Sequence, residues 1–177
     1  MEKILESVGV GDVFKVAGFE FIKFYDENGN TVAVAKDSWF NSKFGENNNL
    51  AESKILKKLK EEFLPKIEAA IGAENILEHE VDLLSLDGSE KWGKIREKIS
   101  LPTFDFYRKH VKIFDKHKVN NWWWLATPDA TSEHLNDDWI ACVSPSGIIY
   151  YYDSRYSNIG VRPFLIFVSS ISVSCEG

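Results

Sequence analysis

The chain has 177 residues, with 44% hydrophobic and 27% charged side chains, and this balance is typical of one globular domain covering residues 1–177. Its net charge of −6 disfavours general binding to nucleic acid or other polyanions. There is no run of about 18 apolar residues, and the first residues lack the basic and apolar regions of a secretory signal. We therefore expect no membrane partner, and a location in the cytoplasm or in a phage particle assembled there.

The N-terminal third reads as an antiparallel meander. Residues 12–24 favour two short strands, because large β-forming side chains occur on both sides of a break at Ala17–Gly18. Asn28–Gly29 is typical of a tight hairpin turn. Residues 31–36 (TVAVAK) predict the strand that returns from this turn.

A polar loop over residues 40–50 leads into the clearest predicted helix. Its apolar positions fall at helical spacing, with Lys and Glu between them: Ile55, Leu56, Leu59, Phe63, Ile67 and Ile71. Asn49 is the expected N-cap and Gly72 the expected C-cap. Pro65 lies inside the pattern, so we expect a kink or a break there.

The middle of the chain alternates short elements. Residues 81–86 predict an apolar strand, and residues 90–98 predict a short helix. A Ser or Thr within Ser100–Thr103 is the expected cap of another helix over residues 104–111. Residues 112–121 read as a polar connection.

The C-terminal third changes to a β pattern. We expect strands at residues 122–125, 139–144, 148–153 and 161–168. A turn at Pro145–Gly147 joins the second and third of these as a hairpin. The predicted fold class is α+β, with an antiparallel sheet formed by N- and C-terminal strands and two or three helices from the middle of the chain on one side.

Three consecutive tryptophans occupy the first of these strands. Successive side chains of a strand alternate between its faces, so Trp123 must point away from Trp122 and Trp124. One interpretation is a sheet covered on both sides, which makes Trp122 and Trp124 structural. The other is that Trp123 is a stacking platform for a sugar, a base or a partner side chain.

A tyrosine-rich segment follows in the next hairpin. Its aromatic and polar side chains resemble the composition of a binding surface: Tyr150, Tyr151, Tyr152, Arg155, Tyr156 and Asn158. Tyrosine is also common in ordinary strands, so both a ligand surface and a packed strand are consistent with this pattern.

Arg162 lies in the last apolar strand. An unpaired buried charge is costly, so we expect a structural arginine that is paired with backbone carbonyls or with a carboxylate. Asp82, Asp105 and Asp153 are the candidate partners.

No motif predicts catalysis, a cofactor or a metal site. Cys142 and Cys175 lack metal-ligand spacing, and a structural buried Cys142 is favoured over a nucleophile paired with a histidine. The four histidines show no metal-binding spacing. The loop 129–138 contains Asp129, Glu133, Asp137 and Asp138 but no EF-hand pattern, so no cation site is predicted.

Several fragments, in this order, resemble a domain-of-unknown-function family of gut Firmicutes and their phages. They span residues 10 to 168 and read GDVFKVAGFEFI, ESKILKKL, VDLLSL, WWWLATP, VSPSG and GVRP. The chain has Ala126 where that family usually has Arg. The family more distantly resembles C-type-lectin-like domains and the formylglycine-generating-enzyme group, which implies a ligand face built from loops between the last strands.

Three functional hypotheses follow. The first is a non-catalytic recognition or structural module, phage- or prophage-associated, that binds a protein or a glycan through residues 150–158 and the loop 129–138. The second is a phage-encoded inhibitor of a bacterial defence protein, using the basic segment Lys91–Lys118, which is also the one segment suited to nucleic acid. The third, implied by the resemblance, is a formylglycine-generating-type enzyme with a reactive Cys142. The sequence indicates no oligomeric state.

Overall fold

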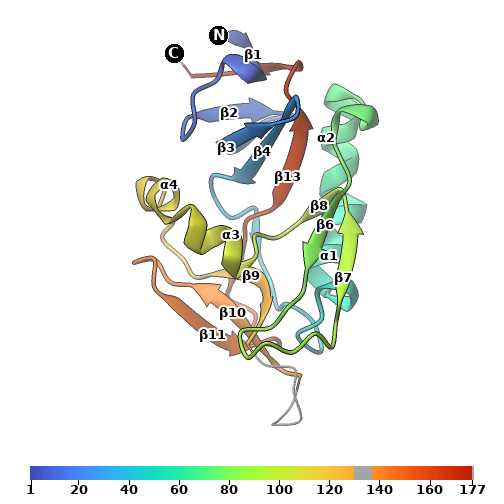
Figure 1. The fold of residues 1–177 in the computed structure, drawn as a ribbon, viewed down its shortest axis with the longest axis vertical. Coiled ribbons are helices and arrows are strands. Elements are labelled where there is room, and N and C mark those ends of the chain that lie inside the picture. Colours follow the sequence, from blue (N-terminus) through green and yellow to red (C-terminus); the bar gives the residue numbers. More distant parts are fainter. Residues whose placement is uncertain (130–136, 177) are drawn as a thin grey trace.

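The computed structural model describes residues 1–129 and 137–176. This part of the chain is a mixed α+β fold, dominated by antiparallel sheets (Figure 1). The α+β class predicted from the sequence is therefore confirmed. None of the helices within the described residues is long and apolar enough to cross a bilayer.

Strands from both ends of the chain form a seven-stranded antiparallel sheet, as predicted. In spatial order its strands are β1 (Glu2–Ile4), β14 (Ser172–Ser174), β2 (Val13–Val16), β3 (Phe19–Glu27), β4 (Asn30–Ala35), β13 (Phe164–Val168) and β8 (Ile99–Ser100). The β3–β4 turn places Asn28 at φ 52° and Gly29 at φ 76°. Both angles are left-handed, which explains the Asn-Gly pair at this turn.

The tryptophan strand belongs to a second sheet, which the sequence interpretation had merged with the first. In spatial order its strands are β11 (Ile149–Asp153), β10 (Trp139–Val143), β9 (Trp123–Pro128), β12 (Gly160–Val161) and β5 (Phe40–Asn41). Only the β12–β9 pair is parallel among the described strand pairs. β11 pairs with β10 alone and forms one edge of this sheet.

A separate two-stranded ribbon corrects two predictions. The strand expected at residues 81–86 is β6 (His79–Asp82), and the helix expected at residues 90–98 is instead β7 (Lys94–Glu97). In β7 the exposed Lys94 and Arg96 form ion pairs with Glu80 and Glu78 of the neighbouring segment. These cross-strand pairs support the strand, whereas the charge-rich sequence had favoured a helix.

The predicted helix is continuous but contains three segments: α1 (Lys54–Lys58), the π-helical turn η3 (Leu59–Phe63) and α2 (Leu64–Ile71). Asn49 caps a short 3-10 turn, η2 (Leu50–Glu52), and Ser53 is the cap of α1 because its hydroxyl accepts a hydrogen bond from the Leu56 N–H. Gly72 ends the helix at φ 88°, as predicted. Pro65 falls in the first turn of α2, where proline is tolerated.

Two further helices lie between β8 and β9. Thr103 caps α3 (Phe104–Lys109), and α4 (Val111–Lys116) occupies much of the segment expected to be a polar connection. Phe114 of α4 is buried, and its ring centroid lies 4.8 Å from that of Phe24. This apolar contact thus stabilises a short helix in which three of the six residues are charged.

The remaining short helices are the 3-10 turns η1 (Leu5–Ser7) and η4 (Ala73–Asn75). η1 is held by Lys23, whose ammonium donates hydrogen bonds to the Leu5 and Glu6 carbonyls at 3.0 and 3.1 Å. The same ammonium pairs with the Asp26 carboxylate at 2.6 Å. Lys23 is therefore a buried cation with three polar partners. The sequence pattern that predicted the N-terminal strands did not predict this burial.

The helices pack on two different sides of the sheets rather than on one (Figure 1). One apolar cluster contains Leu59 of the long helix together with Trp124. A second cluster contains Phe114 of α4 together with Trp123. The alternation predicted for the tryptophans is therefore confirmed, and β9 is covered on both faces.

The chain passes from the second sheet to the first between β12 and β13. Gly160 in β12 pairs with Trp123, and Phe164 in β13 pairs with Val34. A Cβ atom on Gly160 would overlap Ser38 Oγ, lie 2.8 Å from Ser38 Cβ and lie 3.2 Å from the Trp122 carbonyl oxygen. Gly160 is therefore required by close packing at the point where the sheets connect.

Gly160→Ala should lower the free energy of unfolding by about 1–3 kcal/mol, the usual cost of overpacking. Ser38→Gly removes the two closest atoms, so the double variant should recover at least half of the loss. Urea denaturation of the wild type, both single variants and the double variant measures this coupling. Equal losses in Gly160→Ala and the double variant would contradict the packing explanation.

Candidate functional site

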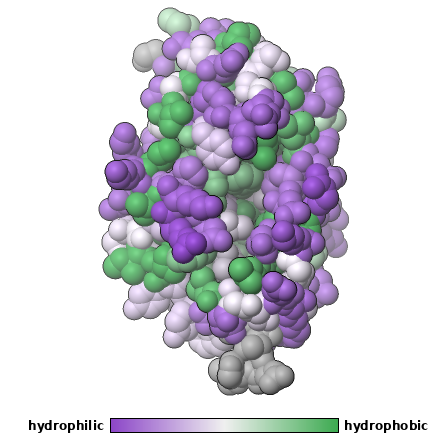
Figure 2. Space-filling view, in the orientation of Figure 1, coloured by the Kyte–Doolittle hydropathy of each residue, from purple (hydrophilic) through white to green (hydrophobic). Residues whose placement is uncertain are grey.

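The tyrosines predicted to form a ligand surface are substantially exposed. Tyr150, Tyr151 and Tyr156 keep 53%, 50% and 48% of their surface accessible. Tyr150 and Tyr151 belong to the edge strand β11. In Figure 2 the surface over β10 and β11 is green to pale, whereas hydrophilic side chains cover α3 and the β6–β7 ribbon. These large aromatic groups are thus accessible from solvent.

One face of β11 forms a cluster that we call the tyrosine platform: Trp122, Tyr150, Tyr152 and Tyr156. Trp122 meets Tyr150 and Tyr152 edge-to-face, with both centroid distances 5.3 Å. Tyr152 stacks on Tyr156 at 5.1 Å with an interplanar angle of 14°. These mutual contacts fix the ring orientations before any ligand arrives.

Strand alternation places Tyr151 on the opposite face of β11. There it meets Trp139 edge-to-face at 5.2 Å. Trp139 is also partly accessible at the surface. The edge therefore has two aromatic faces, of which the tyrosine platform is the larger.

Three asparagines border the platform and form what we call the amide cluster: Asn41, Asn121 and Asn158. The Asn121 amide donates to Asn41 Oδ1 at 3.2 Å and to the Asn158 carbonyl at 3.4 Å. Asn121 Oδ1 accepts from the Trp122 N–H at 2.8 Å, which connects the cluster to the platform. Asn158 belongs to the segment predicted from the sequence, whereas Asn41 and Asn121 were not predicted. The three asparagines come from distant segments, and no local pattern in the sequence joins them.

Arg155 lies beside the platform in a charge-balanced network. Its guanidinium bonds to the Asp153 carboxylate through Nε at 2.8 Å and Nη2 at 2.6 Å, and it approaches Asp138 at 3.2 Å. Hydrogen bonding from Arg155 holds the pKa of Asp153 below its usual value. Arg155 therefore orders the turn after β11 and presents little uncompensated charge.

Trp123, the other predicted ligand contact, is buried with 2% of its surface accessible. Its ring packs against Phe114 and under the Arg162 guanidinium, whose central carbon lies 4.6 Å from the ring centroid. A ligand cannot stack on this ring without opening the core, so the platform interpretation of Trp123 is wrong. Trp124 is fully buried and Trp122 partly buried, consistent with structural roles.

Arg162 is buried, as predicted, but none of its candidate carboxylate partners contacts it. Within the described residues it forms no ion pair with Asp82, Asp105 or Asp153. Its Nε donates to the Ala35 carbonyl at 3.1 Å, and the guanidinium lies over the rings of Trp123 and Phe114. Its Nη2 has no hydrogen-bond partner among the described residues, and the negative charge of Asp37 acts on the group from a distance. Burial lowers the pKa of Arg162 to about 10, so it remains charged at neutral pH.

We expect Arg162→Met to remain within about 1 kcal/mol of wild-type stability, because it keeps volume and removes a costly buried charge. Arg162→Lys should lose about 2–3 kcal/mol, since a compact, strongly hydrated ammonium replaces the stacked guanidinium. Urea denaturation of both variants tests this order of stability. A methionine variant less stable than the lysine variant would contradict this account.

A histidine and a serine form a buried pair beside a cavity of about 170 Å³. His79 Nε2 lies 2.7 Å from Ser100 Oγ, while His79 Nδ1 faces the Leu77 carbonyl at 3.5 Å. A carbonyl at that distance is a weak orienting group, and no carboxylate among the described residues hydrogen-bonds the ring. The pair is better explained as a satisfied polar contact in the core.

His79 should make folding sensitive to mild acid. Burial lowers the pKa of His79 to about 4 from an ordinary 6.5. The folded state favours the neutral form of His79. The contribution of His79 to the free energy of unfolding is therefore complete above pH 6.5 and is lost as the pH falls toward 4. The difference in unfolding free energy between wild type and His79→Gln should shrink by up to about 3 kcal/mol over this range. Urea titrations at several pH values measure it; a pH-independent difference would exclude His79 as the cause.

Cys142 lies in the larger apolar cluster and is fully buried. Burial raises the pKa of its thiol to about 12, so the reactive thiolate is scarce at neutral pH. Cys142 and Cys175 are both free thiols. This environment supports a packing role for Cys142.

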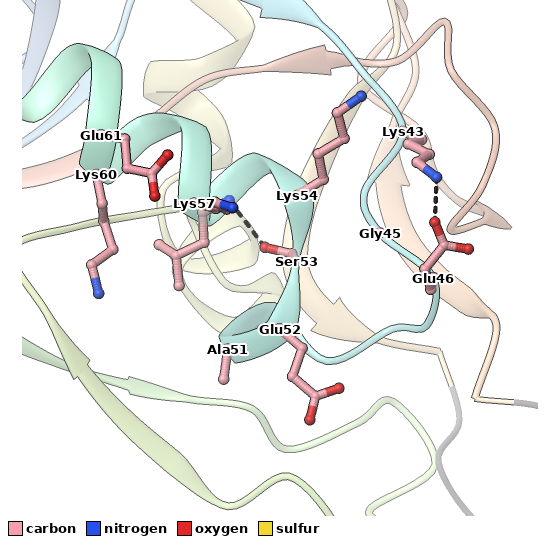
Figure 3. A pocket seen from close by; sticks show the side chains of 11 residues that line it. Lys43, Gly45, Glu46, Ala51, Glu52, Ser53, Lys54, Lys57, Lys60 and Glu61 are labelled. Carbon is pink, nitrogen blue, oxygen red and sulfur yellow. Dashed lines mark hydrogen bonds and ion pairs between the residues drawn. The ribbon is translucent and has the colours of Figure 1, made fainter.

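A larger cavity lies elsewhere, between the loop after β5 and the start of the long helix (Figure 3). This open groove of about 750 Å³ is lined by charged side chains of both signs: Lys43, Glu46, Glu52, Lys54, Lys57, Lys60 and Glu61. Lys43 pairs with Glu46, and Lys60 pairs with Glu97 outside the groove. The sequence had assigned no role to these lysines, and the mixed charges of the groove do not favour one ligand class.

The basic segment Lys91–Lys118 is largely compensated. Six of its nine cations form ion pairs, with Asp137, Glu80, Glu78, Glu68, Asp105 and Asp115. This pairing reduces the free positive charge that contact with nucleic acid or an acidic partner would use. In the described part of the chain no group of three or more His, Cys, Asp or Glu side chains is placed to hold a metal; Glu133 and Asn136 of the acidic loop lie outside it.

No protein-family model matches this chain, and it matches neither a curated protein nor a solved structure.

Proposed function

We propose that this chain is a non-catalytic recognition module whose ligand surface is the aromatic edge. This name covers the tyrosine platform, the amide cluster and the Tyr151–Trp139 pair. The observation that carries the proposal is the half exposure of Tyr150, Tyr151 and Tyr156. Large, rigid aromatic groups held at the surface are the residues that contribute most to binding energy in interfaces.

The arrangement of the edge supports recognition over simple packing. The rings are held by each other and by Trp122, so a ligand would order few additional side chains. Such preorganisation lowers the entropic cost of binding. The neighbouring Asn41, Asn121 and Asn158 add hydrogen-bonding groups that could set orientation and specificity.

The proposal rests on this local chemistry. A C-type-lectin-like architecture would agree with a ligand face at the end of the last strands, but the proposal does not require it. Catalysis is not invoked, since the residues at the edge are aromatic rings, amides and a paired arginine.

The triple variant Tyr150→Ser/Tyr151→Ser/Tyr156→Ser should bind its ligand at least about tenfold more weakly, because aromatic hot spots contribute most of the affinity. Its Tm should stay close to that of the wild type, since these side chains are already half exposed. Biolayer interferometry against immobilised panels of purified bacterial polysaccharides and bacterial surface proteins measures binding, and calorimetry measures Tm.

A matched control is Lys112→Ser/Lys116→Ser on α4, which changes exposed side chains that are not part of the aromatic edge. It should bind as the wild type does. If the tyrosine variant instead loses several degrees of Tm, or binds both panels unchanged, the aromatic edge is a structural feature and the proposal is wrong.

A further inference from the structure

The chemistry of the tyrosine platform and its amide cluster identifies a class of ligand. We infer that this face of β11 binds a neutral carbohydrate, with a pyranose ring on the tyrosines and its hydroxyls on the asparagines. The inference rests on the proposed function and deepens it by naming the ligand class and the face used.

The face has little free charge to offer. Arg155, the cation that follows β11, bonds to Asp153 through two nitrogens and also approaches Asp138. An anionic ligand would have to compete with these carboxylates for the guanidinium. A nucleic-acid strand or a sulfated polymer depends on such contacts to its anions, so the face favours an uncharged ligand.

The rings offer flat apolar area of a suitable kind. Tyr156 is stacked on Tyr152 through one ring face, and 48% of the residue's surface is accessible. Tyr150 is held at a right angle to Trp122 and is similarly accessible. The face of an aromatic ring carries partial negative charge, which attracts the weakly positive C–H groups on one side of a pyranose.

The amide cluster supplies the polar half of the recognition. Asn158 Oδ1 accepts from the Asn41 amide at 3.5 Å, but the Asn158 Nδ2 donates to no atom of the described residues. Within the same residues the Tyr150 and Tyr156 hydroxyls also form no hydrogen bond. Neighbouring sugar hydroxyls both donate and accept, so they match amide and phenol groups placed around a ring.

A purely apolar partner side chain would fit the rings but would bury these polar groups without partners. Each polar group left without a hydrogen bond would weaken binding. A sugar ring can form these hydrogen bonds through its hydroxyls and can contact the aromatic rings at the same time. Exposed ring faces beside an amide that can still donate hydrogen bonds therefore favour a sugar over an apolar peptide.

The test is isothermal titration calorimetry of the full chain with neutral tetrasaccharides of β-1,4-linked glucose, mannose and N-acetylglucosamine, and with a heparin tetrasaccharide. At least one neutral sugar should bind, with an affinity that changes little with salt, and heparin should not. Tyr156→Ala should weaken binding about tenfold or more, and Asn158→Ala about threefold to tenfold. Ile4→Ala is the matched control, because Ile4 is as exposed as Tyr156 but lies in β1 of the other sheet, and it should leave the affinity unchanged.

Absence of binding to every neutral tetrasaccharide would overturn the carbohydrate assignment, as would equal losses in Ile4→Ala and Tyr156→Ala. If a surface protein binds the wild type and is lost in the triple tyrosine variant, the recognition module stands and its ligand is a protein. If that variant binds both panels unchanged, the proposed function fails as well.

Discussion

The Arg162 side chain, through the volume that it fills between the two sheets, is the constraint on which their relation depends. It lies where the chain leaves β12 for β13, it donates to the Ala35 carbonyl at the end of β4, and it covers the ring of Trp123 in β9. One side chain thus contacts one strand of each sheet. Aromatic faces lie where a buried cation ordinarily has a directly bonded carboxylate, and a guanidinium tolerates this because it is planar and weakly hydrated.

This use of Trp123 determines where recognition can occur. β9 has neighbours on both sides in its sheet and apolar clusters on both faces, so its tryptophans are committed to the core. β11 has one strand neighbour, and its side chains extend beyond the clusters. Trp122 precedes β9 and reaches the rings of β11, so it couples the packed strand to the exposed one.

The sequence predicted elements whose signals are local, and it missed contacts between distant segments. The Asn28–Gly29 turn, the Gly72 helix end and the alternation of the tryptophans follow from backbone geometry at single positions. The strand β7 was predicted as a helix because its stabilising ion pairs come from the segment around β6. The tyrosine part of the candidate site was visible as one segment, whereas Asn41 and Asn121 join Asn158 only in the folded chain.

An exposed aromatic edge strand has a physical cost, since its outer backbone groups and rings can pair with another copy of the chain. β11 has five residues, and the Arg155–Asp153 contact follows it directly, which limits the length available for such pairing. The net charge of −6 adds repulsion between copies at longer range. That repulsion does not act on an uncharged ligand. A locally neutral, aromatic surface on an acidic chain can therefore discriminate between a neutral ligand and another copy of the same chain.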